Sequence, residues 1–279
     1  MGGEAYVEPT VVAGLALLAA GASGTVEPAV SEAADWLVSI QRTDGALGLC
    51  TGLPDPCWAT PHAVLLWAGL GGYQSQRALA TAWLLSVSGE TILLDEAVAV
   101  DIGHDTTIPG WGWVQGTPSW IEPTAWALLA LRREGWSDHP RVGDGIRMIC
   151  DRAIPSGGWN FGNRAVFGSI LPPQPDLTAL ALLALVGSAC DERLIERGCR
   201  FLASTLPGIR SPRSLAWGLL ALDAWQRKPR EGETWLAESF AYVARNRPTP
   251  LDLAQLLLAA NPRSLELLAA RHPQPTESR

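Results

Sequence analysis

A repeated apolar helix pattern constrains this chain more than any other feature of its sequence. Four clear copies read YVEPTVVAGLALLAAG, CWATPHAVLLWAGLGG, WIEPTAWALLALRREG and PDLTALALLALVG, starting at Tyr6, Cys57, Trp120 and Pro175. Two looser copies start at Arg213 and Pro250. Repeats of this length, roughly 40 to 60 residues, indicate stacked supersecondary units that bury their apolar faces only against their neighbours.

The copies are apolar almost all round, so we expect them to be inner helices enclosed by other helices. More amphipathic stretches lie between them and are predicted outer helices. Proline in the first turn and glycine after the apolar run fit helix starts and stops. The register of the alignment is set by one position in each copy, namely Thr10, His62, Thr124, Thr178, Leu215 and Asp252.

The pattern predicts an all-α fold of five to six inner and outer helical hairpins, arranged as an α/α toroid. Strand signals are nearly absent, and only residues 90–101 could form a short pair, around ETILL and AVAVDI. A linear solenoid would use the same hairpins, and the repeat alone does not choose between the two. Residues 1–262 are assigned to one repeat domain, and residues 263–279 to a polar, partly disordered tail.

Charge and cysteine usage exclude several classes of function. The net charge is −7 and the 21 Lys and Arg residues are scattered, so no basic surface for nucleic acid is expected. The five cysteines are odd in number and form no CxxC pair, which is typical of reduced thiols in a cytoplasmic protein. No apolar run reaches about 18 residues, so membrane contact is expected to be peripheral at most.

The loops that enter the first inner helices are long, and we expect the binding site among them. They contain GWGW at 110–113 and GGWNFGN at 157–163. One interpretation is an aromatic cavity that holds an apolar polyene or stabilises a carbocation. The other is that the rings pack the loops against neighbouring repeats. The candidate binding residues are Trp58, Trp111, Trp113, Trp120, Trp159, Asn160 and Phe161.

Acidic residues recur two positions before the aligned position, as Glu8, Glu122 and Asp176. A carboxylate in the first turn is also favoured by the helix dipole, which is the structural explanation. The functional explanation is that Glu122 and Asp176 include a general acid, kept protonated by apolar surroundings.

Three segments resemble squalene and oxidosqualene cyclases. AADWLVSIQRTDGALG (33–48) and IPSGGWNFG (154–162) look like the QW repeat of that family. QPDLTA (174–179) is similar to its DxDDTA motif, with Asp176 on the middle acid and Gln174 and Leu177 replacing the other two. The resemblance implies binding of an isoprenoid and its proton-initiated cyclisation, with Asp176 as donor and Glu122 as auxiliary. A non-catalytic toroid that binds a lipid or a partner protein is the competing hypothesis.

A second resemblance is to the β-subunit of protein prenyltransferases, which holds zinc with an Asp-x-Cys pair before an inner helix and a histidine before the next. Asp55 and Cys57 match the pair, but WIEPT supplies no histidine. His62, or His104 with Asp101 or Asp105, would have to complete the set. Zinc is therefore kept as an alternative, and no cofactor is assigned. The aspartate-rich diphosphate-binding motif of class I terpene synthases is missing.

Overall fold

The computed structural model describes residues 4–21 and 26–268, and these residues form two concentric layers of helices. The inner helices are α1 (Val7–Ala19), α3 (Thr60–Leu70), α6 (Ile121–Arg133), α8 (Pro175–Ala184), α10 (Pro212–Ala224) and α12 (Pro250–Ala259). The outer helices are α2 (Val26–Ile40), α4 (Gln74–Ser86), α7 (Pro140–Asp151), α9 (Glu192–Thr205) and α11 (Gly232–Ala244). A short 3-10 turn at Leu206–Gly208 follows α9.

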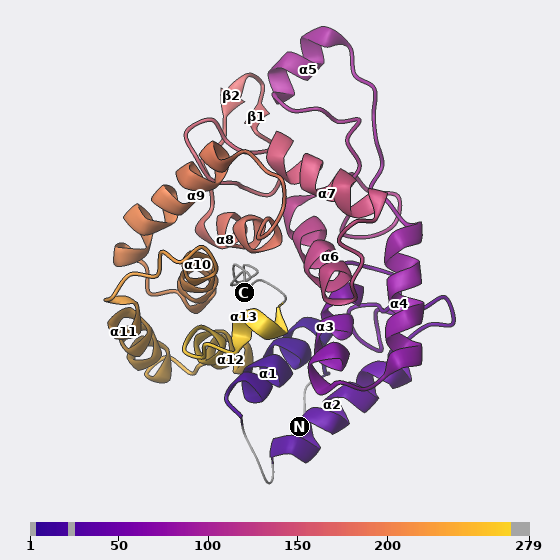
Figure 1. Cartoon of the computed structure of the whole chain (residues 1–279), viewed down its shortest axis with the longest axis vertical. Coiled ribbons are helices and arrows are strands. Elements are labelled where there is room, and N and C mark those ends of the chain that lie inside the picture. The colour runs from indigo at the N-terminus through magenta and orange to yellow at the C-terminus, as the bar shows by residue number, and fades with distance from the viewer. Residues whose placement is uncertain (1–3, 22–25, 269–279) are drawn as a thin grey trace, which may run out of the picture.

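The inner helices form a closed ring. Each contacts the next in chain order, and α12 contacts α1, so the ring has no free end (Figure 1). Each outer helix packs against the inner helix that precedes it. The predicted all-α toroid is therefore confirmed, and the structure is a ring and not a linear solenoid.

The inner helices that carry the recurrent acids run parallel. The first turns of α1, α6 and α8 carry Glu8, Glu122 and Asp176, and all three side chains reach Arg213 in the first turn of α10. Helix starts that meet in this way must lie at the same end of the ring. We call this end the mouth.

Below the mouth, side chains fill the interior of the ring. The rings of Trp126 on α6 and Trp217 on α10 meet edge to face, with their centroids 5.3 Å apart. The centroid of the His62 imidazole on α3 lies 4.2 Å from that of the Trp126 ring. All three are buried. An aromatic layer thus occupies the level directly below the acids.

Threonine hydroxyls hold three entering loops against the inner helices by hydrogen bonds. These hydrogen bonds also show that the predicted alignment of α3 with the other inner helices is wrong by two residues. Thr124 accepts a hydrogen bond from the backbone N–H of Trp111 (2.9 Å), and Thr178 accepts one from that of Trp159 (2.9 Å). In α3 the same bond joins Leu47 to Thr60 (2.9 Å). Thr60, and not His62, is therefore equivalent to Thr124, and His62 belongs to the aromatic layer with Trp126.

One local prediction from the sequence is wrong, and one short hairpin was not predicted. The segment proposed as a strand pair at 90–101 instead forms helix α5 (Glu96–Ile102) over its second half. The described strands are β1 (Ala165–Val166) and β2 (Ser169–Ile170), an antiparallel hairpin beside α5 (Figure 1). Two-residue strands carry too little alternation to be recognised in a sequence.

The folded ring also extends beyond residue 262. Helix α13 (Ser264–Leu267) covers the end of the ring opposite the mouth, with Leu265, Leu267 and Leu268 buried. The backbone carbonyl of Glu266 accepts a hydrogen bond from Arg133 at the end of α6. The rest of the predicted tail, residues 269–279, lies outside the described residues.

Candidate functional site

A cluster of charged side chains occupies the mouth. Arg213 donates from Nε to Asp176 (2.8 Å) and from Nη2 to Glu122 (2.5 Å), and its Nη1 lies 3.4 Å from Glu8. The side chain of Glu122 is 6% exposed, against 21% for Asp176 and 35% for Arg213. The cluster brings together the predicted pair Glu122 and Asp176, and places Arg213 between them.

Burial dominates the electrostatics of two of these acids. Loss of solvent raises the pKa of Glu122, and the nearby Arg213 guanidinium opposes that shift without cancelling it. The pKa of Glu8 is raised for the same reason, and Arg213 again opposes the shift. Three ionised carboxyl groups around one guanidinium would carry a net negative charge. Protonation of one buried carboxyl group therefore reduces the repulsion among them.

A groove of about 450 Å³ opens beside this cluster. Trp120 and Gln174, which line it, are the N-cap residues of α6 and α8 and precede Glu122 and Asp176 by two positions. The lining is largely aromatic and apolar, from Trp113, Trp120, Asn160, Phe161, Asn163, Leu171, Pro172 and Gln174. Its volume lies within the range of small-molecule sites, about 300–1,000 Å³.

Four of the predicted binding residues, Trp113, Trp120, Asn160 and Phe161, line this groove. The amide of Asn160 is engaged by its own loop, because Nδ2 donates to the carbonyl of Asn163 and Oδ1 accepts from the N–H of Gly162. Asn160 therefore shapes the wall, and the aromatic rings supply the contact surface.

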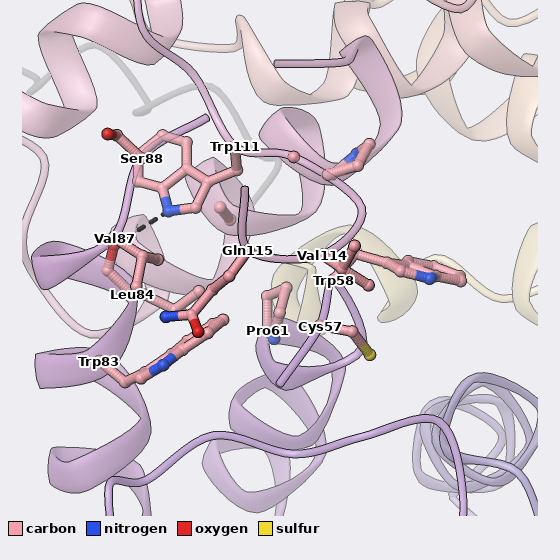
Figure 2. Close-up of a pocket in the computed structure, with 13 residues that line it drawn as sticks. Cys57, Trp58, Pro61, Trp83, Leu84, Val87, Ser88, Trp111, Val114 and Gln115 are labelled. Atoms are coloured by element: carbon pink, nitrogen blue, oxygen red, sulfur yellow. Dashed lines mark hydrogen bonds between the residues drawn. The ribbon is translucent and has the colours of Figure 1, made fainter. Parts of the chain in front are cut away.

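Trp58 connects the groove wall to the interior of the ring. Its ring meets Trp113 edge to face at 5.0 Å and His62 at 5.1 Å. Trp58 also lines the small pocket that contains Trp83 and Trp111 (Figure 2). Trp58 therefore stands between the groove and the aromatic layer.

Trp111 and Trp159 do not line the groove, and their burial supports the alternative that they pack loops against repeats. The indole N–H of Trp111 donates to the carbonyl of Leu84 on α4 (2.9 Å; Figure 2), and that of Trp159 donates to Ile149 on α7 (2.7 Å). Both rings are buried. Trp111 also packs on Gly145 of α7, and Trp159 on Gly198 of α9.

The zinc alternative lacks a complete ligand set. Among the residues that the structure describes, no three His, Cys, Asp or Glu side chains converge as a metal site. Burial raises the pKa of the Cys57 thiol to about 11, which disfavours the thiolate that zinc requires. Asp55 and Cys57 are therefore not proposed as zinc ligands. All five cysteines are free thiols.

No family model matches the chain, and no curated protein sequence matches it significantly. Solved structures do match. The type II terpene cyclase MstE from Scytonema aligns with 88% of this chain and 69% of its own, at 19% identity and a TM-score of 0.55. The chain has a terpenoid-cyclase-like fold.

Two further structures share this fold. A variant of the Scytonema cyclase in complex with geranylgeranyl dihydroxybenzoate, its substrate, aligns at 17% identity and a TM-score of 0.54, covering 88% of this chain and 70% of its own. A protein from Actinoplanes aligns at 18% identity and a TM-score of 0.51, covering 87% and 71%. Within residues 4–21 and 26–268, no helix is both long and apolar enough to cross a bilayer.

Sequence reasoning missed two residues of this terpenoid-cyclase-like ring. Arg213 lies two positions before the aligned residue Leu215, which is the place that Glu8, Glu122 and Asp176 occupy in their own copies. Its position therefore indicated that it would meet the acids, but it was overlooked because its charge is opposite to theirs. His62 was aligned with the threonines because it follows Pro61, as Thr124 follows Pro123, whereas the hydrogen bond from Leu47 shows that Thr60 is the equivalent residue.

Proposed function

We propose that this protein binds an isoprenoid in the aromatic groove and cyclises it by proton transfer from the carboxyl cluster at the mouth. The observation that carries the proposal is the position of Trp120 and Gln174, which place an apolar groove within one helical turn of Glu122 and Asp176. The geranylgeranyl ligand of the Scytonema cyclase supports an isoprenoid as the ligand class.

The burial of the two acids favours exchanging the roles inferred from the sequence. An alkene is protonated only by a carboxyl group that holds its proton, which requires burial and a raised pKa. Glu122 has both. Both carboxyl groups accept a hydrogen bond from Arg213, but the side chain of Asp176 is the more exposed of the two. We therefore assign Glu122 as the proton donor and Asp176 as the residue that positions Arg213 beside it.

Glu122→Gln is expected to reduce cyclised product by about 100-fold, because the amide keeps the shape of the side chain and cannot supply the proton. The assay incubates purified protein with linear isoprenoids, among them geranylgeraniol, and detects cyclised lipids by mass spectrometry. Asp176→Asn should retain more activity than Glu122→Gln.

Glu8→Gln is the matched control, since Glu8 also contacts Arg213 but has no assigned part in proton transfer. Its product yield should stay close to that of the native protein. Product formation unchanged in Glu122→Gln would remove Glu122 as the donor. If the native protein and all variants bind isoprenoids saturably but none forms a cyclised product, the alternative is favoured, in which the toroid binds a lipid without catalysing a reaction.

An exposed apolar surface beside the groove supports peripheral contact with a lipid phase, from which an isoprenoid could be taken up. The β1–β2 hairpin leads directly into Leu171, which lines the groove. Its tip residue Phe167 is 93% exposed, and Val100 on the neighbouring α5 is 73% exposed. Exposed apolar surfaces of this kind mark interaction sites. Asp95 and Asp101 lie in the same region, so neutral lipid surfaces should be preferred to anionic ones.

The double variant Phe167→Ser, Val100→Ser should bind phosphatidylcholine vesicles about 10-fold or more weakly than the native protein, because two exposed apolar side chains are lost. Vesicle sedimentation measures this. Tyr242→Ser on α11, another exposed ring far along the chain, should have no effect. Equal loss in both variants, or stronger native binding to anionic vesicles, would contradict the proposal.

A further inference from the structure

The outer layer of the ring lacks one helix among the described residues. Each of the first five inner helices is followed by an outer helix, but α12 is followed by α13, which covers the end of the ring opposite the mouth. Figure 1 shows the interruption in the described outer layer, between α11 and α2 and outside α12 and α1. At the other positions an outer helix covers the inner layer, so the sixth position is open to a helix from elsewhere.

An apolar groove lies at this open position. Its volume is about 710 Å³, and its walls are the facing sides of α11 and α12. Along each helix the lining residues are spaced i, i+3, i+4 and i+7, which is the pattern of a helix face that packs against another helix. Phe240 is 53% exposed and Leu253 is 37% exposed. The lining residues are Glu233, Leu236, Ala237, Phe240, Leu253, Leu256, Leu257 and Ala260.

The segments of the sequence outside the described ranges do not match this groove. Residues 1–3 and 22–25 are too few to form a helix that covers two others. Residues 269–279 contain Pro273 and Pro275 and have no Leu, Ile, Val, Met, Phe, Tyr or Trp. None of these segments offers an apolar helix face, whereas α11 of a second copy does.

The charges along α11 match a second copy in antiparallel orientation. Glu233 lies in the first turn and lines the groove, while Arg245 and Arg247 follow the last turn, and all three residues are exposed. When two α11 helices lie side by side and antiparallel, Glu233 of each copy meets the basic end of the other. Such a contact is self-complementary, as a two-fold symmetric interface requires. Phe240 lies between the charged ends, close to the two-fold axis.

We propose that this groove is the interface of a homodimer, in which α11 of a second copy occupies the position of the missing outer helix. The contact is reciprocal, because each α11 packs against α11 and α12 of the other copy and covers Phe240 and Leu253. The inference goes beyond the proposed function and does not depend on it, since the acids at the mouth take no part in the interface.

The first test measures the mass of the full chain by sedimentation equilibrium over a range of concentrations. The native protein should be a dimer at about 100 μM, and Phe240→Glu should raise the dissociation constant of the dimer about 10-fold or more. Tyr242→Glu is the matched control. Tyr242 is also exposed on α11, but it lies about 200° around the helix from Phe240, so this variant should remain a dimer.

The second test reverses the charges at the two ends of α11. Glu233→Arg should weaken the dimer about 3-fold or more, because it places a positive charge beside Arg245 and Arg247 of the other copy. Adding Arg245→Glu and Arg247→Glu to the same chain should restore the dimer, since each copy then supplies the reversed pair. All three positions are exposed, so these variants keep the test valid if Phe240→Glu fails to fold.

Three results would overturn the inference. The first is a native protein that is monomeric at every concentration; if that monomer binds an apolar dye and Phe240→Glu does not, the groove has another occupant. The second is equal weakening of the dimer by Phe240→Glu and Tyr242→Glu, which would place the interface elsewhere. The third is a dimer that Glu233→Arg weakens but the combined reversal does not restore, because the antiparallel pairing of α11 requires that recovery.

Discussion

Trp159→Ala is expected to reduce the free energy of unfolding by about 3–5 kcal/mol, the usual cost of removing a fully buried tryptophan. The ring of Trp159 lies between two outer helices: its N–H bonds to Ile149 on α7, and its edge packs on Gly198 of α9. The variant would lose that hydrogen bond and leave a cavity between consecutive repeats. Urea denaturation followed by far-UV circular dichroism measures the change.

A double-mutant cycle with Gly198 isolates this contact. A Cβ at Gly198 would approach Cζ3 of Trp159 to 2.8 Å, so Gly198→Ala should destabilise the native protein although alanine is the better helix former. In the Trp159→Ala background the same change should become neutral or stabilising. Gly143 on α7 has open space around its Cβ direction, so Gly143→Ala should stabilise by up to about 1 kcal/mol in either background. Additive effects of Trp159 and Gly198 would contradict the packing role.

The sequence alone does not separate these packing tryptophans from the aromatic residues of the groove. In the extended loops, Trp111 and Trp159 are buried, whereas Trp113 and Phe161, two positions later, line the groove. A regular extended segment places residues two positions apart on the same side, so strand periodicity does not predict this difference. Trp111 and Trp159 are set apart by the hydrogen bonds of their indole N–H groups to the outer helices α4 and α7, which the loop sequences do not show.

The ring, its helices and the recurrent acids were predictable because each repeat shows its own apolar pattern in the sequence. Contacts across the ring were not, because they join repeats far apart in the chain. Arg213 reaches Glu8 only because α10 and α1 lie on opposite sides of α12 in a closed ring. The exposed fractions of Glu122 and Asp176 likewise depend on how deeply the first turn of each helix lies in that ring. These exposed fractions are the reason that Glu122, and not Asp176, is proposed as the proton donor.

Arg213→Met should destabilise the protein by about 2–4 kcal/mol at pH 8, because it leaves the buried carboxyl of Glu122 without its counter-charge. The estimate is below that for a fully buried pair since Arg213 is 35% exposed. The effect should shrink toward pH 5. Arg213 holds down the pKa of Glu122 and Glu8, and without it both values rise further above the unfolded value of 4.5. A carboxyl with a raised folded pKa favours the folded state at low pH, and that contribution is lost as the pH rises through the folded pKa.

Thermal unfolding of Arg213→Met and the native protein from pH 5 to pH 8 measures this difference. Adding Glu122→Gln to Arg213→Met should recover much of the lost stability at pH 8, because the variant then has no unpaired charge at that position. Arg200→Met, which breaks an exposed ion pair with Glu196, is the control and should cost less than about 1 kcal/mol. A loss in Arg213→Met that is equal at pH 5 and pH 8, and that Glu122→Gln does not reduce, would mean that Arg213 acts through packing and not as the counter-charge of the acids at the mouth.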